Sequence, residues 1–198
     1  MAASQAEGTV VFVQHCALEL SRKPWDFASD NATAIDDHWN RRRRSNPAFF
    51  NGVVHVLEAG TIVNGTFHAT FKRTDFKSFL YWRETGYPDA AAHDAFGSAL
   101  VVSREGHVVL GRQRAGNINA GIAYLPGGFI DQRDVANDGT IDIAASIRRE
   151  LTEETGLTEP DVVEQSGFLA KGRDRGHGEP RRRGEGPWLC QACSVCRR

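Results

Sequence analysis

Residues 149–157, with the sequence RELTEETGL, combine three carboxylates at a spacing that suits metal chemistry. Glu150, Glu153 and Glu154 stand at i, i+3 and i+4, so a helix would carry them on one flank. Glu150 and Glu154 are like charges one turn apart, and their repulsion destabilises a helix unless a cation offsets it. Mg²⁺ prefers such carboxylate oxygens and often bridges them to phosphates. The spacing therefore predicts a divalent metal site for a phosphate-bearing substrate.

The helix that carries these glutamates is expected to begin near residues 140–142. Its apolar positions share one face, because they stand at i, i+3 and i+7: Ala144, Ile147 and Leu151. At about 100° per residue, the glutamates fall beside this stripe rather than opposite it. Gly156 stands where a glycine commonly ends a helix. The pattern predicts a helix that packs on a core and holds its acids at the rim of a cleft.

Short β-prone runs and turn signals surround this helix and must position it. Asn64-Gly65 lies between two of the runs, and Asn-Gly is a strong signal for a hairpin. A second hairpin is expected within residues 96–111, and a short amphipathic helix at residues 75–83. We expect strands at residues 9–13, 53–57, 66–71, 96–103, 107–111, 123–125 and 162–170.

The composition excludes several classes of protein. Of the 198 residues, 40% are hydrophobic and 25% are charged, values typical of a globular chain rather than a disordered one. The net charge of −1 gives no overall field that attracts nucleic acid or acidic lipid. No apolar run reaches the length of a membrane span, and the first residues lack a basic segment followed by an apolar core. We therefore expect a cytoplasmic protein without a membrane partner.

The segments LPGGFIDQRD and IRRELTEETGL together resemble the Nudix box. That signature is a Gly, five residues, an acid, seven residues, then Arg-Glu-aliphatic-x-Glu-Glu-x-Gly-aliphatic. Gly128 matches the first glycine, Asp134 stands where the family usually has Glu, and residues 149–157 match the remainder. Fourteen residues instead of seven separate Asp134 from Arg149. This difference indicates a seven-residue insertion in a loop, where extra length costs little.

The resemblance implies an α/β fold, the Nudix α/β/α sandwich with a mixed sheet, and a pyrophosphohydrolase that uses Mg²⁺ or Mn²⁺. Its substrate would be a nucleoside diphosphate linked to another moiety. Divalent ions neutralise the phosphates, position them and lower the pKa of a bound water. The resemblance assigns the metal to the glutamates and the Gly128 carbonyl, with one glutamate also accepting the water's proton. Arg149 would orient a carboxylate, with Glu153 one turn away. The predicted site residues are thus Gly128, Arg149, Glu150, Glu153 and Glu154.

A second pattern, in the first half, is similar to the leader of Nudix hydrolases that act on UDP-sugars. It consists of Trp39, Arg42, Arg43, Asn46-Pro47 and Phe50-Asn51-Gly52. The pattern favours a nucleotide sugar, such as UDP-glucose or ADP-ribose, as the substrate. The alternative is that the aromatic residues belong to the core and that Arg41–Arg44 are a solvated charge run. Gln113 and Arg114, at the end of a strand near the expected cleft, either contact substrate phosphates or are ordinary exposed side chains.

Two other site types receive less support. Four arginines at residues 41–44 beside Trp39 can bind nucleic-acid phosphates, but no recognition motif accompanies them, so we expect no nucleic-acid partner. Cys190, Cys193 and Cys196, with His177 upstream, form one irregular set, whereas zinc sites normally pair two regular ones. The resemblance leaves a homodimer open, because a dimer partner often completes the substrate site in the family.

The chain divides into three segments by composition. We expect a β-rich N-terminal subdomain at residues 1–94, the Nudix core at 95–170 and a disordered tail at 171–198. The tail has eight Lys or Arg, three Asp or Glu and five glycines, and it lacks periodic apolar residues. The strands and second helix that follow the box in the family are not evident in it. The sequence therefore suggests truncation or a frameshift near residue 171. The alternative function is a catalytically silent Nudix domain that only binds nucleotide.

Overall fold

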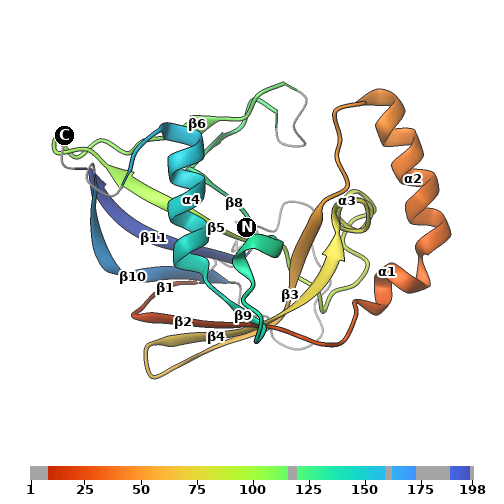
Figure 1. Ribbon diagram of the computed structural model, residues 1–198, viewed down its shortest axis with the longest axis horizontal. Helices are drawn as coiled ribbons and strands as arrows, with labels where there is room; N and C mark the ends of the chain where they lie inside the picture. Colours follow the sequence, from red (N-terminus) through yellow and green to blue (C-terminus); the bar gives the residue numbers. More distant parts are fainter. Residues whose placement is uncertain (1–8, 116–119, 159–161, 173–187, 197–198) are drawn as a thin grey trace, which may run out of the picture.

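The computed structural model describes residues 9–115, 120–158, 162–172 and 188–196 (Figure 1). The helices are α1 (Asp26–Asp30), α2 (Ala32–Ser45), α3 (Phe76–Glu84) and α4 (Ile143–Thr155), with a 3₁₀ turn, η1 (Gln132–Asp134). The strands are β1 (Thr9–Val13), β2 (His15–Leu20), β3 (Val53–Val63), β4 (Thr66–Asp75), β5 (Ala95–Val102), β6 (Gly111–Arg112), β7 (Ala123–Tyr124), β8 (Gly127–Phe129), β9 (Thr140–Ile141), β10 (Val162–Gly172) and β11 (Trp188–Cys196). Within the described residues, no helix is both long and apolar enough to cross a membrane.

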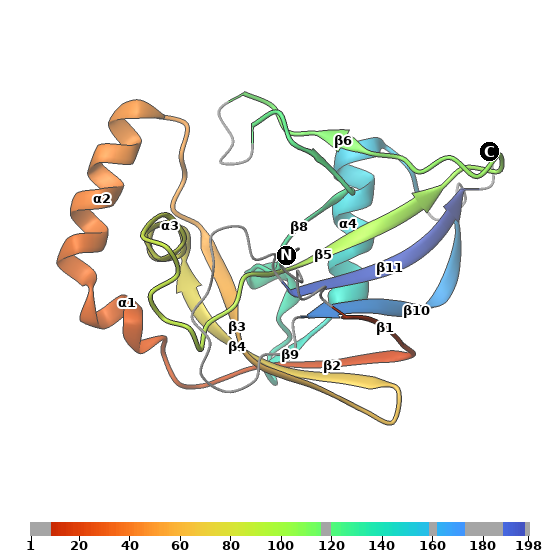
Figure 2. The same cartoon turned by 180° about the vertical axis from the view of Figure 1, so that it is seen from behind.

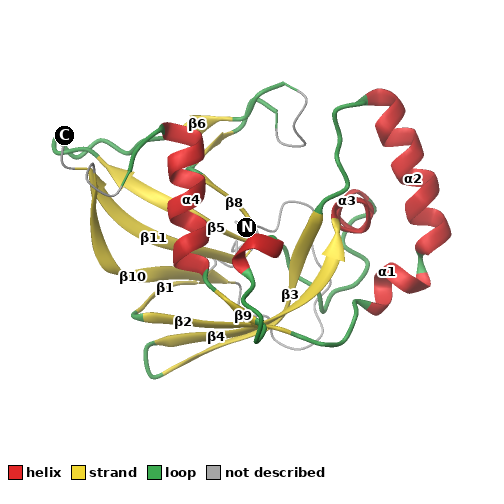
Figure 3. Cartoon of the chain, in the orientation of Figure 1, coloured by secondary structure: helices red, strands yellow, loops and turns green. Residues whose placement is uncertain are grey.

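Two mixed sheets form the framework. The larger has the strand order β1-β10-β11-β5-β8, in which β11 and β5 run parallel and the other pairs run antiparallel. The smaller has the order β3-β4-β2-β9, with β2 parallel to β4. Helix α4 lies against β5, and α1, α2 and α3 gather at the other end of the molecule (Figure 3). The predicted α/β fold with a mixed sheet is confirmed, and it is consistent with a Nudix α/β/α sandwich.

One hydrophobic core joins both sheets to α4. It contains Phe67 and Phe71 of β4, Ala99 and Val101 of β5, and three residues of α4, which are Ile143, Ile147 and Leu151. Burial of this shared apolar surface is the main favourable contribution to folding. The four-stranded sheet therefore supports the helix that carries the glutamates, although the two are far apart in the sequence.

Local signals at the ends of α4 explain where it begins and ends. The Asp142 side chain accepts a hydrogen bond from the Ala145 backbone at 2.9 Å, which satisfies an N–H of the first turn. Gly156 ends the helix with φ at 74°, in the left-handed region. Both ends agree with the sequence prediction. In the predicted stripe, Ile147 and Leu151 are buried and Ala144 is half-buried.

Glycine at position 97 of β5 lets α4 pack closely on the sheet. A Cβ atom at this position would lie 2.7 Å from Ile143 Cδ1 and 2.7 Å from Ile147 Cγ1. Such contacts are too short for a Cβ atom, so only glycine fits without a shift of these two side chains or of the helix that carries them. The height of the helix above the sheet, and with it the position of the glutamates, thus depends on Gly97.

The β3–β4 hairpin also follows its sequence signal. Asn64 and Gly65 both have positive φ, at 49° and 76°, as the tight hairpin turn requires. The second predicted hairpin is only partly correct. Residues 107–110 join β5 through a single bridge between Val102 and Val108. Strand β5 instead pairs along its length with β11 and at one end with β8.

Helices α1 and α2 are not predicted by the sequence pattern. Only one residue of α2, Ile35, is buried, so the helix lacks a clear apolar stripe. Polar and aromatic contacts hold α2 against α3: Arg42 pairs with Glu84 and Lys77 with Asp36, His38 Nε2 lies 2.7 Å from Glu84 Oε2, and Trp39 packs on Phe76. The predicted N-terminal β-rich segment is therefore a mixed region of strands and helices. Its boundary near residue 94 stays a prediction.

The prediction of a disordered tail is wrong for residues 188–196. These residues form β11, which lies between β10 and β5 in the larger sheet (Figure 2). The expectation that no strand follows residue 171 fails for the same reason. Cys190, Cys193 and Cys196 all lie within β11, whereas His177 and the rest of 173–187 lie outside the described residues.

His55 of β3 links the smaller sheet to the loop that precedes α4. Its side chain is 2% exposed, and its Nδ1 lies 2.9 Å from the Ile130 carbonyl oxygen. Because a carbonyl only accepts hydrogen bonds, Nδ1 carries the proton. Nε2 is buried and has no hydrogen-bond partner among the described residues. Burial lowers the pKa of His55 below its ordinary value of 6.5, so the neutral ring is the form that the fold accommodates.

We predict that the protein loses stability as the pH falls below 6.5, in part because of His55. The unfolded chain binds a proton at this histidine near pH 6.5, whereas the folded chain binds it only at lower pH. The free energy of unfolding should fall by up to about 1.4 kcal/mol per pH unit from this group. Urea unfolding at pH 7, 6 and 5 should show a shallower decline for His55→Asn, whose amide can still donate to Ile130.

The control for this prediction is His107→Asn, since His107 is an exposed histidine. Its pH dependence should match that of the unmodified chain. An equally steep decline in His55→Asn and the unmodified chain would show that His55 does not contribute.

Candidate metal and phosphate site

The loop between β8 and α4 is fixed by a reciprocal pair of hydrogen bonds around η1. The Asp131 side chain accepts from the Arg133 backbone N–H at 2.7 Å. The Asp134 side chain accepts from the Asp131 backbone N–H at 2.9 Å. This capping box satisfies two backbone donors at once and leaves the loop little conformational freedom. It sets the directions in which Asp131, Arg133 and Asp134 point.

The seven extra residues between Asp134 and Arg149 can be accommodated by residues 135–141, a segment whose two ends meet. The Asp142 N–H donates to the Asp134 carbonyl oxygen at 2.9 Å, and Val135 bridges Ile141. Without the insertion, seven residues would separate Asp134 from Arg149, as in the family signature. The inserted segment also supplies β9, which pairs with β2. The segment thus forms a short loop that connects the site to the four-stranded sheet through the pairing of β9 with β2.

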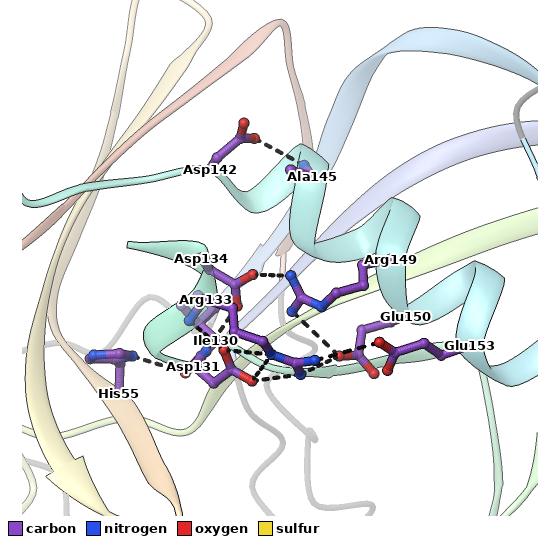
Figure 4. Close-up of polar contacts among 10 residues, drawn as sticks. All are labelled: His55, Ile130, Asp131, Arg133, Asp134, Asp142, Ala145, Arg149, Glu150 and Glu153. Carbon is purple, nitrogen blue, oxygen red and sulfur yellow. Dashed lines mark hydrogen bonds and ion pairs between the residues drawn. The ribbon is translucent and has the colours of Figure 1, made fainter. Parts of the chain in front are cut away.

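Arg149 and Asp134 form an ion pair next to Glu150 (Figure 4). Arg149 Nη1 donates to Asp134 Oδ1 at 2.6 Å, and the Asp134 side chain is 0% exposed. This hydrogen bond raises the pKa of Arg149, which stays charged. Arg149 Nη2 also lies 3.5 Å from Glu150 Oε1. The expected partner of Arg149, Glu153, is therefore replaced by Asp134 and Glu150.

Glu150 lies against Gly128 of the glycine loop. Its side chain is 16% exposed, and a Cβ atom at position 128 would lie 2.7 Å from the Glu150 Oε2 atom. Gly128 is needed here because any side chain would displace this carboxylate. Burial raises the pKa of Glu150, and the charge of Glu153 raises it further. The Glu150 carboxylate thus occupies a place where a nearby cation would be strongly favoured.

The other two glutamates have different surroundings. Glu153 is 52% exposed and lies 3.5 Å from Arg133 Nη1. Glu154 accepts hydrogen bonds from the Tyr124 hydroxyl at 2.7 Å and from the Gly127 N–H at 2.9 Å. Burial and the bond to Glu154 raise the pKa of Tyr124 to about 12, so the phenol remains a donor at neutral pH. Glu154 is therefore turned toward the loop before β8.

The predicted ligands Glu150, Glu153 and Gly128 lie side by side at one end of α4. Among the described residues, no three Asp, Glu, His or Cys side chains already converge as a metal cluster. The donor set nevertheless suits a hard divalent cation, because it offers carboxylate and carbonyl oxygens and a half-buried carboxylate whose pKa is raised. The assignment of these residues as metal ligands stays a prediction.

A cavity of about 650 Å³ opens beside Gly127 and Gly128. Six aromatic side chains from both halves of the chain line it, together with small, aliphatic and polar residues. The lining includes Phe49, Phe50, Phe76, Phe96, Tyr124 and Phe129, with the polar residues Arg83, Asp94, Ser98 and Gln113. Gln113 is among the lining residues, and its contact with substrate phosphates stays a prediction. Arg114 is exposed and is not part of the lining.

Three residues of the site escaped the sequence prediction: Tyr124, Asp131 and Arg133. Asp131 and Arg133 fall within the five positions that the signature leaves unspecified. Tyr124 precedes the Gly-Gly turn and meets Glu154 only through the fold. A sequence signal for this charge network does exist. It is an acid and an arginine two residues apart in a glycine-rich loop that precedes an acidic helix.

We predict that Asp134→Ala destabilises the fold by about 3 kcal/mol, because it leaves the Arg149 guanidinium half-buried without its counter-ion. Urea unfolding measures the change, and Asp37→Ala, at an exposed position of α2, is the matched control. The control should change the free energy of unfolding by less than about 0.5 kcal/mol. Equal stability of the two variants would contradict a structural role for the buried ion pair.

Comparison with known proteins agrees with this geometry. The family model of the NUDIX domain matches residues 91–189, which is half of the chain. The match covers the glycine loop, α4 and the beginning of β11. Comparison with curated proteins returns no match. The chain therefore belongs to the Nudix superfamily and is a hydrolase of phosphoanhydride bonds that acts on a nucleoside diphosphate derivative.

Proposed function

We propose that the protein hydrolyses the diphosphate of a nucleotide sugar, such as UDP-glucose or ADP-ribose, with Mg²⁺ or Mn²⁺ held by Glu150, Glu153, Glu154 and the Gly128 carbonyl. The observation that carries the proposal is the continuity between the aromatic cavity and the carboxylates. Gly128 both lines the cavity and lies against Glu150. A ligand that fills the cavity would therefore bring its diphosphate to the glutamates.

The side chains around the glutamates support separate roles in this reaction. A bound divalent ion would neutralise phosphate charge and activate a water. Glu150, half-buried beside Gly128, is suited to hold the ion. Glu153 is exposed and is suited to accept the proton of the water. Glu154 is oriented by Tyr124 and Gly127, so its carboxylate has a defined position before any ligand arrives.

The cavity supports a ligand with a flat ring and polar groups. Aromatic walls stack on nucleobases, and polar side chains then select among them. The Ser98 hydroxyl is buried, has no hydrogen-bond partner among the described residues and belongs to the lining. Gln113 and Arg83 add donors at other points of the wall.

The residues of the leader pattern differ in their relation to the cavity: Phe50 lines it, whereas Trp39 and Arg42 contact residues of its wall. Phe50 is 81% exposed and lines the cavity, so it is not a core residue. Trp39 packs on Phe49 and Phe76, which are lining residues. Arg42 pairs with Glu84 and lies 5.6 Å from the centre of the Phe49 ring. We infer that Phe50 touches the substrate and that Trp39 and Arg42 position the aromatic wall.

The first test measures phosphate products from UDP-glucose, ADP-ribose, NADH and dinucleoside polyphosphates with Mg²⁺. We predict that Glu153→Gln and Glu154→Gln lower kcat at least 100-fold, the order expected for loss of a proton acceptor or a metal ligand. Glu105→Gln, at an exposed turn, is the matched control and should retain full activity.

Two results would overturn parts of this proposal. Absence of turnover on every substrate by folded protein would leave the nucleotide-binding, catalytically silent domain as the function of this chain. Turnover that is unaffected by both glutamate substitutions would show that the reaction uses other residues.

A second prediction concerns the aromatic wall. Phe50→Ala should raise KM for the preferred substrate about tenfold, with kcat nearly unchanged, because stacking on a base contributes equally to ground and transition states. The exposure of Phe50 means that stability should not change. Phe12→Ala, at an exposed phenylalanine of β1, is the control. A loss confined to kcat would contradict a binding role for Phe50.

A further inference from the structure

The guanidinium of Arg133 lies among three carboxylates of the candidate metal site (Figure 4). Its Nη2 atom is 2.7 Å from Asp131 Oδ2 and 3.8 Å from Glu150 Oε1, and its Nη1 atom is 3.5 Å from Glu153 Oε1. The positive charge that offsets the repulsion between these glutamates is therefore supplied, in part, by the chain itself.

The three contacts of Arg133 differ in strength. Asp131 accepts several hydrogen bonds from this side chain, with Nε at 3.2 Å from Oδ1 and Nη2 at 2.7 Å from Oδ2. Such a forked arrangement is the strong form of an arginine–carboxylate pair. The distances to Glu150 and Glu153 are longer, so these two contacts are mainly electrostatic. Arg133 is thus held by hydrogen bonds to Asp131, and its contacts with the two glutamates are weaker.

Arg149 is the other arginine close to Glu150, and it cannot play the same part. Its Nη1 is held by the fully buried Asp134, and its own side chain is 24% exposed. The Arg133 side chain is 56% exposed and belongs to a loop rather than to α4. Moving Arg133 away from the glutamates therefore exposes little apolar surface and breaks no short hydrogen bond to them.

We propose that Arg133 is a built-in counter-ion that competes with the divalent cation for Glu150 and Glu153. The proposal rests on the proposed metal ligands. A metal that takes these carboxylate oxygens would meet the guanidinium at close range, and two like charges at about 4 Å repel by about 1 kcal/mol in water and more near a protein surface. Binding of the metal therefore drives Arg133 away from the glutamates, while Asp131 retains it.

This arrangement has two consequences for the site. Without metal, Arg133 keeps the glutamates from repelling one another and holds them near their working positions. With metal, the lost contacts subtract from the affinity, so the site fills only at higher metal concentration. Removing the charge of Arg133 should tighten metal binding, whereas removing a ligand should weaken it.

The test measures binding of Mn²⁺ alone by loss of the free-ion signal in electron paramagnetic resonance, without substrate. The variants are Arg133→Gln, which keeps a side chain that can bond to Asp131, and Arg104→Gln, which removes the same charge at an exposed turn. We expect Arg133→Gln to lower the Kd for Mn²⁺ about fivefold, the scale of an exposed ion pair, and Arg104→Gln to leave it unchanged.

Glu153→Gln in the same titration tests the ligand assignment separately from the competition by Arg133. If this substitution weakens Mn²⁺ binding and Arg133→Gln leaves the Kd equal or higher, competition by Arg133 is refuted while the ligand assignment stands. If Glu153→Gln has no effect on the Kd, the proposed ligands are wrong, and the proposed role of Arg133 is refuted as well. A lower Kd for Arg133→Gln alone, with weaker binding by Glu153→Gln, supports the proposal.

Discussion

The buried ion pair between Asp134 and Arg149 joins the two segments of the site. Asp134 belongs to the loop after β8, and Arg149 belongs to α4, immediately before Glu150. Because Asp134 has no contact with solvent, its charge is compensated by Arg149 and by the N–H of Asp131. This pair fixes the loop against the helix, and the glycine loop, the three glutamates and Arg133 take their relative positions from it. An aspartate meets this requirement although the family usually has glutamate.

Much of the local structure was accessible from the sequence, because neighbouring residues determine it. Asp142 and Gly156 delimit α4, and Asn64-Gly65 turns the β3–β4 hairpin. The spacing of the box carried the Nudix resemblance, and the resemblance in turn implied the mixed α/β fold. Each of these features depends on contacts that are short in sequence or on a motif of known geometry.

The features that were missed depend on contacts between distant segments. Helix α2 has a single buried residue and is supported by charges on α3, which no periodic pattern reveals. Strand β11 lies in a segment of unfavourable composition, and its neighbours β5 and β10 provide the pairing that such a strand requires. Tyr124 and Arg133 acquire their roles from Glu154 and Glu150, which come close only after folding. Tertiary contacts, rather than local propensity, decided these cases.

The cavity has one wall from the first half of the chain and another from the Nudix core. Phe50 and Phe76 precede the matched region, whereas Phe96 and Phe129 lie within it. A ligand that touches both walls binds only the state in which both regions are folded. Its binding free energy therefore adds to the stability of that state and links the unfolding of one region to that of the other. Substrate would thus act as a reversible cross-link between the two parts of the chain, and its concentration would set how cooperatively they unfold.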